Sequence, residues 1–252
     1  MSLTVIVGAA RGIGRAIAEE LAGADPARAL LIADVDAEHA QDAAQALAAR
    51  GVDASAVKVD VRDPDSVADL VAQSSAADRV AIAAGIFRTS PALTTPVSEF
   101  EEVLRVNAIG CFHVAQQYAA AMARSGGGAI VGVASIAARM PRMRQAAYSA
   151  SKAALRQALR VLAMEVLSDG VRINTVSPGA TDTEMMRQLA GDHSSVADLA
   201  DGSLEALRPR IPAGRVGTAR DIASVVSFLL SPASDHVAMQ DIVVDGGELL
   251  GM

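Results

Sequence analysis

Tyr148 and Lys152 are the two residues whose chemistry and spacing point most directly to catalysis. Residues four positions apart share one face of an α-helix, so the phenol and the ammonium group would lie side by side. The lysine charge favours the phenolate form of the tyrosine, and such a tyrosine can exchange a proton with a substrate hydroxyl. An ordinary exposed helix face has the same spacing, so the pair is informative only if other elements build a site around it.

A glycine-rich turn near residue 10 has the setting of a nucleotide-binding loop. Residues 3–7 form a short apolar run typical of a buried strand, and residues 15–22 have a helical pattern. Glycines let the backbone approach a pyrophosphate, and the N-terminus of the following helix attracts its charge. A tight turn without a ligand is the alternative, but the flanking elements favour the nucleotide. The predicted loop consists of Gly8, Arg11, Gly12, Ile13 and Gly14.

Two acidic residues follow the second predicted strand, residues 29–33. Asp34 stands at the strand end, about 20 residues beyond the glycines, where a carboxylate accepts hydrogen bonds from an adenosine ribose. Asp36 is the competitor for this role, and helix capping is the alternative for both. Arg11 favours the 2′-phosphate of NADP, but a carboxylate at Asp34 would repel that phosphate. The sequence therefore predicts NAD rather than NADP.

Composition narrows the class of protein. Hydrophobic residues make up 51% of the 252 residues and aromatic residues only 2%, which suits a parallel sheet with close-packed helices. The net charge is 22 − 29 = −7, without a basic cluster, so no nucleic-acid partner is expected. Cys111 is the only cysteine, and neither it nor the histidines have metal-ligand spacing, so no metal is predicted. The absence of a signal-like segment and of a long apolar run predicts a cytoplasmic protein without membrane contact.

Strand and helix patterns alternate along the chain without a linker. The strands are predicted at residues 3–7, 29–33, 54–59, 79–84, 129–134, 171–176 and 240–244. This pattern predicts one doubly wound α/β domain of the Rossmann type over residues 1–252, with about seven parallel strands and helices on both faces. Residues 98–123 are expected to form one long helix, and the polar residues 181–212 a substrate lid. Ligands of such sheets bind beyond the carboxyl ends of the strands, which are Gly8, Asp34, Asp60, Gly85, Ser135 and Pro178.

Taken together, these motifs resemble the short-chain dehydrogenase/reductase family over nearly the whole chain. The resemblance implies a Rossmann domain with a seven-stranded parallel sheet, usually assembled as a homotetramer. Hydrophobic residues replace the polar ones that the family usually has at Val7 and at Ile82-Ala83, which affects local hydrogen bonding but not the catalytic set. The resemblance is carried by Gly8-x-x-x-Gly12-Ile13-Gly14, Asp60, Ala84-Gly85, Asn107, Ser135, Tyr148-x-x-x-Lys152, Pro178-Gly179 and Asp245-Gly246-Gly247.

The family resemblance also implies residue roles. Tyr148 would be the acid/base and would also contact the cofactor, and Lys152 would activate it and bind the nicotinamide ribose. Ser135 would hold the substrate oxygen, and Asn107 a water that relays protons to Lys152. The other residues implied around the cofactor are Asp60, Val61, Ala84, Gly85, Pro178 and Gly179, with Thr181 and Thr183 at the nicotinamide amide.

Two segments, Thr181-Asp182-Thr183 and Gln240-Asp241, are similar to the 2,3-dihydro-2,3-dihydroxybenzoate dehydrogenases of catechol siderophore biosynthesis. This similarity implies NAD-dependent oxidation of a cyclohexadiene diol carboxylate to 2,3-dihydroxybenzoate. The carboxylate needs a cation, for which Arg88 and Arg142 are the candidates, although either is equally compatible with a solvated surface. Met140 and Met185 are expected to form an apolar wall against the substrate ring, although they are equally compatible with ordinary packing inside the protein.

Three other functions are compatible with the sequence. One keeps the family but changes the substrate: a trans-2,3-dihydro-3-hydroxyanthranilate dehydrogenase, whose substrate also aromatises and bears a carboxylate. A 3-oxoacyl or general alcohol reductase using NADPH is favoured by Arg11 but disfavoured by Asp34. A catalytically silent nucleotide sensor is disfavoured because the four catalytic residues are intact.

The apolar residues 249–252 predict a subunit contact.

Overall fold

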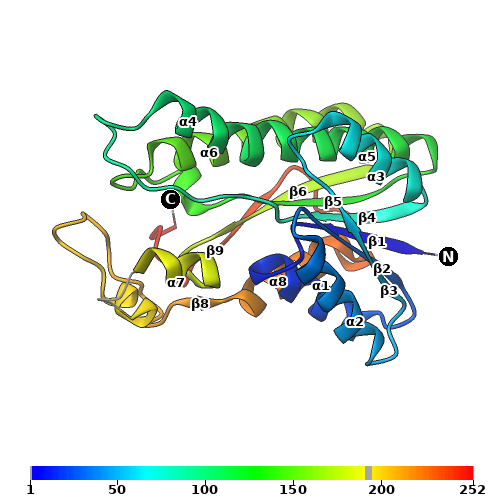
Figure 1. Ribbon diagram of the computed structural model, residues 1–252, viewed down its shortest axis with the longest axis horizontal. Coiled ribbons are helices and arrows are strands. Elements are labelled where there is room, and N and C mark those ends of the chain that lie inside the picture. The colour runs from blue at the N-terminus through cyan, green and yellow to red at the C-terminus, as the bar shows by residue number, and fades with distance from the viewer. Residues whose placement is uncertain (1, 191–194, 252) are drawn as a thin grey trace.

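Figure 1 shows the computed structural model, which describes residues 2–190 and 195–251. A parallel sheet of seven strands in the order β3-β2-β1-β4-β5-β6-β9 forms its centre. The order reverses between β1 and β4, as in a doubly wound sheet, and the predicted fold is confirmed. The strands are β1 Leu3–Val7, β2 Ala29–Asp34, β3 Ala54–Lys58, β4 Ala77–Ile82, β5 Gly128–Val133, β6 Val171–Pro178 and β9 Asp241–Val244.

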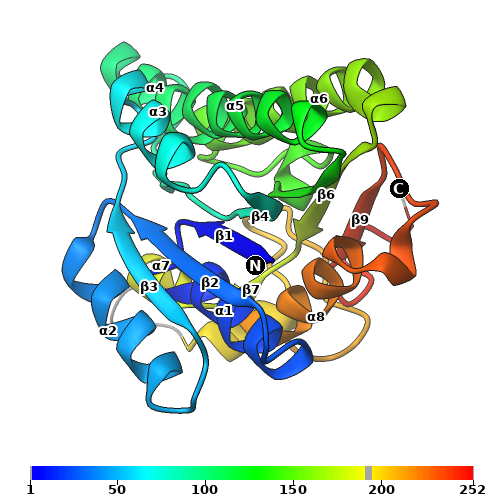
Figure 2. The same ribbon diagram turned by 90° about the vertical axis from the view of Figure 1, so that its right-hand side faces the viewer.

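Helices cover both faces of the sheet (Figures 1 and 2). One layer contains α1 Gly12–Ala24, α2 Ala37–Ala48 and α8 Ala219–Leu230, whose small and aliphatic side chains join one buried cluster. The other layer contains α3 Pro64–Gln73, α4 Val97–Leu104, α5 Cys111–Arg124 and α6 Ala146–Val166. Val7 and Ile82, apolar where the family usually has polar residues, pack into the core of this second layer.

The helix predicted over residues 98–123 is interrupted. A π-helix, Arg105–Gly110, separates α4 from α5. The Cys111 N–H donates to the carbonyls of Val106 and Ala108, and it passes over the carbonyl of Asn107 that a regular α-helix would use. The irregular turn therefore coincides with a residue that was predicted to be catalytic.

The predicted lid region contains regular structure. It holds α7 Glu184–Ala190, the 3-10 helix Val196–Asp201, and β7 Thr181–Asp182, which pairs with β8 Gly217–Thr218. Residues 191–194 of the predicted lid lie outside the described residues. Single 3-10 turns follow β5, α6 and α8 at Ile136–Ala138, Leu167–Asp169 and Pro232–Ser234.

The apolar C-terminal residues are buried unevenly. Leu249 is 2% exposed within its own chain, so its burial needs no subunit contact, whereas Leu250 is 68% exposed. Met252 lies outside the described residues. Among the described residues, no helix is long and apolar enough to cross a membrane, and no group of three metal-ligating side chains occurs.

Candidate active site

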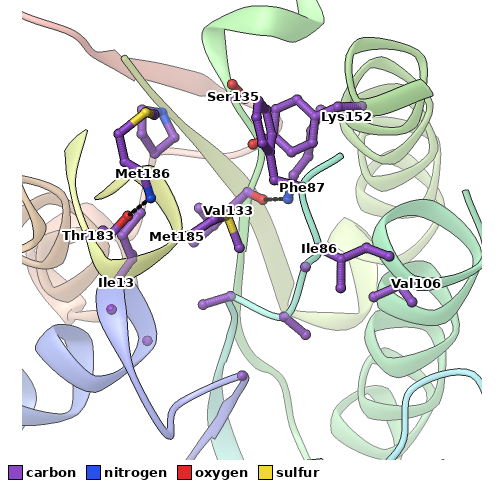
Figure 3. A pocket seen from close by; sticks show the side chains of 18 of the residues that line it. Ile13, Ile86, Phe87, Val106, Val133, Ser135, Lys152, Thr183, Met185 and Met186 are labelled. Carbon is purple, nitrogen blue, oxygen red and sulfur yellow. Dashed lines mark hydrogen bonds between the residues drawn. The ribbon is translucent and has the colours of Figure 1, made fainter. Parts of the chain in front are cut away.

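A cavity of about 810 Å³ lies beyond the carboxyl ends of the strands, across the point where the strand order reverses. Its walls bring together the N-terminus of α1, the ends of β1, β2, β4, β5 and β6, the start of α6 and the segment around α7. Figure 3 shows side chains from these separate elements facing one space. All sixteen residues predicted to bind the cofactor line this cavity.

The glycine loop has the shape of a phosphate cradle. Gly12 has φ +57°, and a Cβ there would have the Thr183 side chain as its nearest neighbour, at 3.8 Å. A Cβ on Gly14 would come within 2.0 Å of the Gly8 carbonyl oxygen, so only glycine lets the helix start this close to β1. Within the described residues of α1, the first turn has no acidic side chain, and Arg11 at the N-cap makes no capping hydrogen bond. Free N–H groups at such a helix end fit a pyrophosphate.

The residues after β2 distinguish the two acidic candidates. Asp34 lines the cavity, and its carboxylate accepts from the backbone N–H groups of Ala10 at 2.9 Å and Asp36 at 3.0 Å. These bonds fix its position next to the glycine loop and leave oxygen lone pairs for a ribose. Asp36 caps α2 by accepting from the His39 N–H.

Arg11 is engaged by protein carboxylates. Its guanidinium pairs with Asp36, contacts Nδ1 of His39 at 3.1 Å and reaches Glu184 of α7 at 3.4 Å. Hydrogen bonds from His39, followed by the one from Arg11, hold the pKa of Asp36 below its usual range. The base that would bind a 2′-phosphate is therefore already paired.

The residues that follow β3 and β4 also line the cavity. Asp60 and Val61 line it, and Arg62 forms a bidentate pair with Asp60 that lowers the pKa of this carboxyl. Gly85 lies against the catalytic side chains, since a Cβ there would stand 3.3 Å from Asn107 Oδ1 and 3.4 Å from Lys152 Nζ.

Ser135, Tyr148 and Lys152 meet at the inner wall of the cavity. Ser135 follows β5, and its Oγ accepts from the Ala137 N–H at 3.1 Å, so its own proton is free for a ligand. Lys152 is 4% exposed and donates to the Val133 carbonyl at 2.9 Å (Figure 3). Its Nζ is 5.9 Å from the centroid of the Tyr148 ring. The predicted shared face of α6 is thus present.

Asn107 lies behind this wall. Its Nδ2 donates to the Ile86 carbonyl at 2.9 Å and to Ser151 Oγ at 3.1 Å, and its Oδ1 accepts from the Ile86 N–H at 2.8 Å. The side chain ties the loop after β4 to α6, which makes Asn107 a positioning residue. Its predicted role in holding a water stays a prediction.

The predicted substrate residues are brought together in part. Arg88, Arg142 and Met185 line the cavity. Arg88 is half-exposed and has Glu102 at 3.9 Å, whereas Arg142 is bound to Glu248 at 2.6 Å. Met140 is not among the described residues that line the cavity, whereas Met143 is. These methionines lie in the loop between the 3-10 turn Ile136–Ala138 and α6. A loop has no regular spacing, so the sequence does not predict which of its side chains face the cavity.

Several residues of the site were not predicted. Phe87 packs against Tyr148 with ring centroids 4.5 Å apart at 73°. Gln145, Glu184 and Arg208 also line the cavity. Phe87 had a usable signal, because it is one of only four phenylalanines and follows the strand end at Gly85. Arg208 had none beyond its place in the predicted lid.

Tyr118, the other tyrosine of the chain, lies in a different environment from Tyr148. It is fully buried, shares a 2.6 Å hydrogen bond with Ser74, and burial raises its pKa above the usual range. Burial likewise raises the pKa of the Cys111 thiol to about 11. Neither group is available for proton transfer near neutral pH.

This arrangement of a nucleotide cradle beside Ser135, Tyr148 and Lys152 is that of a nicotinamide-dependent oxidoreductase. Residues 8–248 match the family described as enoyl-(acyl carrier protein) reductase. The chain belongs to the short-chain dehydrogenase/reductase family.

The chain is similar to several named members of this family. The chain is 34% identical to 2,3-dihydro-2,3-dihydroxybenzoate dehydrogenase of Bacillus subtilis, over 99% of this chain and 97% of the relative. It is 39% identical to the Escherichia coli enzyme of the same name, over 77% and 79%. A solved structure assigned as an NAD(P)-dependent gluconate 5-dehydrogenase of Beutenbergia cavernae, with NADP bound, is similar with TM-score 0.88 and 31% identity. The alignment covers 99% of this chain and 97% of that one.

Proposed function

We propose that this chain catalyses the NAD-dependent oxidation of 2,3-dihydro-2,3-dihydroxybenzoate to 2,3-dihydroxybenzoate, in the cytoplasm and as a homotetramer. The observation that carries the proposal is the meeting of Ser135, Tyr148 and Lys152 in a cavity that also exposes arginine side chains to a carboxylate. The two bacterial relatives of this name support the substrate.

The chain's own residues supply binding and proton transfer. Tyr148 takes the proton of a ring hydroxyl, and the ammonium group of Lys152 lies 5.9 Å from the centroid of its ring. Ser135 donates to the same oxygen, where negative charge develops. The bound nicotinamide would accept the hydride from the carbon beneath. The resulting ring ketone tautomerises to the catechol, and the gain of aromaticity drives the reaction forward.

The preference for NAD rests on charge. The Asp34 carboxylate lies beside the glycine loop, where we expect the adenosine ribose to bind, and Arg11 is held by Asp36 and Glu184. A 2′-phosphate would therefore meet negative charge and an engaged base. An acyl reductase using NADPH, the main rival, needs Arg11 to be free.

The deciding assay follows NADH absorbance with purified protein, NAD+ and a panel of substrates. The panel contains 2,3-dihydro-2,3-dihydroxybenzoate, trans-2,3-dihydro-3-hydroxyanthranilate and, in the reverse direction with NADPH, a 3-oxoacyl thioester. We expect the diol acid to have the highest kcat/KM. A higher value for the thioester would refute the proposal, and turnover of none of them would favour a silent nucleotide sensor.

A further inference from the structure

A buried ion cluster joins three distant parts of the chain. Glu248, in the segment after β9, is 1% exposed. Its Oε1 accepts from Arg142 Nη2 at 2.6 Å and from Arg208 Nε at 3.2 Å. Its Oε2 accepts from the Ala180 N–H at 3.2 Å. Arg142 comes from the loop before α6, and Arg208 comes from the predicted lid. The Glu248 carboxylate therefore holds together two guanidinium groups that are far apart in the sequence.

The cluster opens onto the cavity through its arginines. Arg142 and Arg208 line the same space as Ser135 and Tyr148. Their side chains are 10% and 18% exposed. In Figure 1 the chain after β9 runs toward α7 and α6. Glu248, in this segment, is the residue that pairs with both arginines.

One hydrogen-bond donor of this cluster has no acceptor within the described chain. A guanidinium carries five N–H donors, yet Nη1 of Arg142 is buried and has no partner within the described chain. A buried unpaired donor on a charged group is costly. Asp245 adds negative potential near Arg142, but its carboxylate oxygens accept from the Gly247 and Leu249 N–H groups. Arg142 thus has unused hydrogen-bonding capacity beside the cavity that it lines.

We infer that Glu248 holds Arg142 and Arg208 as a two-armed receptor for the carboxylate of the substrate. Guanidinium and carboxylate groups match in a planar, bidentate geometry, and desolvated pairs of this kind are the strongest hydrogen bonds available to the chain. Glu248 is a positioning residue, and the arginines set specificity for an acid over a neutral ring. The inference rests on the proposed function and deepens it, since it assigns the carboxylate site and adds Arg208 and Glu248 to the predicted Arg142.

The test compares Arg142→Met and Arg208→Met with wild-type protein, because each single change leaves Glu248 paired to the other arginine. Calorimetry in saturating NADH measures Kd for 2,3-dihydroxybenzoate and for 2,3-dihydroxybenzamide, which has the same ring without the charge. We expect wild-type protein to bind the acid at least about tenfold more tightly than the amide. Each variant should lose most of that preference while its affinity for the amide is unchanged. Arg210→Met, on the same segment but 72% exposed, is the control and should keep it.

A preference for the acid that survives in both variants would overturn the inference, as would equal binding of acid and amide by the wild type. The comparison repeated with benzoate and benzamide involves no ring hydroxyl and so does not depend on the diol. Loss of diol turnover together with an arginine-dependent preference for benzoate would refute the proposed function while supporting the receptor.

Discussion

The ring of Phe87 meets the ring of Tyr148 edge to face, with centroids 4.5 Å apart. Aromatic pairs in this geometry contribute roughly 0.5–1.5 kcal/mol beyond the area they bury. The contact fixes the direction of the phenol on the first turn of α6, in a chain with few other aromatic residues to do so.

We expect Phe87→Leu to lower kcat about tenfold, because the phenol gains freedom to leave its reactive position. The Kd for NADH, measured by fluorescence, should stay within about twofold. Phe228→Leu changes a phenylalanine that is 46% exposed on α8 and serves as the control. An unchanged kcat in the Phe87 variant would show that the ring contact does not position Tyr148.

The two tyrosines of the chain provide a matched pair. Tyr148→Phe should lower kcat by roughly 10²–10⁴-fold, the usual contribution of a general acid/base, without changing the Kd for NADH. Tyr118→Phe removes a buried hydrogen bond to Ser74 and should reduce the free energy of unfolding by about 1–2 kcal/mol, with kcat retained. Near wild-type turnover in the Tyr148 variant would refute its catalytic role.

We expect the choice between NAD and NADP to depend on the carboxylates that hold Arg11. Removing one of them with Asp36→Ala should free Arg11 for a 2′-phosphate and shift the kcat/KM ratio toward NADP by about tenfold. Glu19→Ala removes an exposed acid of α1 that pairs only with Arg15 among the described residues, and it should leave the ratio unchanged. Comparable wild-type kcat/KM values for NAD and NADP would contradict the preference proposed for Asp34.

The carboxylate of Asp221, in the first turn of α8, is expected to make the free energy of unfolding depend on pH in the acid range. Asp221 accepts from Arg215 and from the N-cap residue Thr218, and these bonds, the Arg215 one first, lower its pKa. A depressed folded-state pKa gives stability that is present above the unfolded value, about 3.9, and is lost as the pH falls through the folded value. Since the side chain is 33% exposed, we expect Asp221→Asn to cost about 1 kcal/mol at neutral pH.

Urea unfolding of wild type and Asp221→Asn at several pH values checks this expectation. The gap in the free energy of unfolding should shrink below about pH 4. Asp201→Asn, where the acid is 81% exposed and 3.8 Å from Arg210, should change stability little at any pH. A gap for Asp221→Asn that is independent of pH would assign the effect to packing instead of charge.

The sequence was informative wherever a residue's role depends on its nearest neighbours in the chain. Strand ends were placed within about two residues because short apolar runs end at polar residues or glycines. Gly12, Asp34, Tyr148 and Lys152 occupy the predicted positions because a strand, a turn and a helix each fix their own side chains locally.

Features that depend on distant contacts or on one extra residue were not predictable. The π-helix at Arg105–Gly110 inserts a single residue into a pattern whose hydrophobic spacing stays helical on both sides. Met143 lines the cavity and Met140 does not, in a loop before α6 where Arg144 has φ +65° and no regular spacing fixes the direction of the side chains. Glu248 meets Arg208 and Arg142 across 40 and 106 positions, a separation that no local pattern encodes.

The cavity crosses the line where the two halves of the sheet join, with β1 and β2 on one side and β4, β5 and β6 on the other. A nucleotide that spans this line contacts both halves, and it binds only when they are assembled. Occupancy therefore adds to the apparent folding free energy by mass action, about 2.7 kcal/mol at a free concentration one hundred times Kd. The concentration of free cofactor thus acts on the stability of the folded protein as well as on the rate of catalysis.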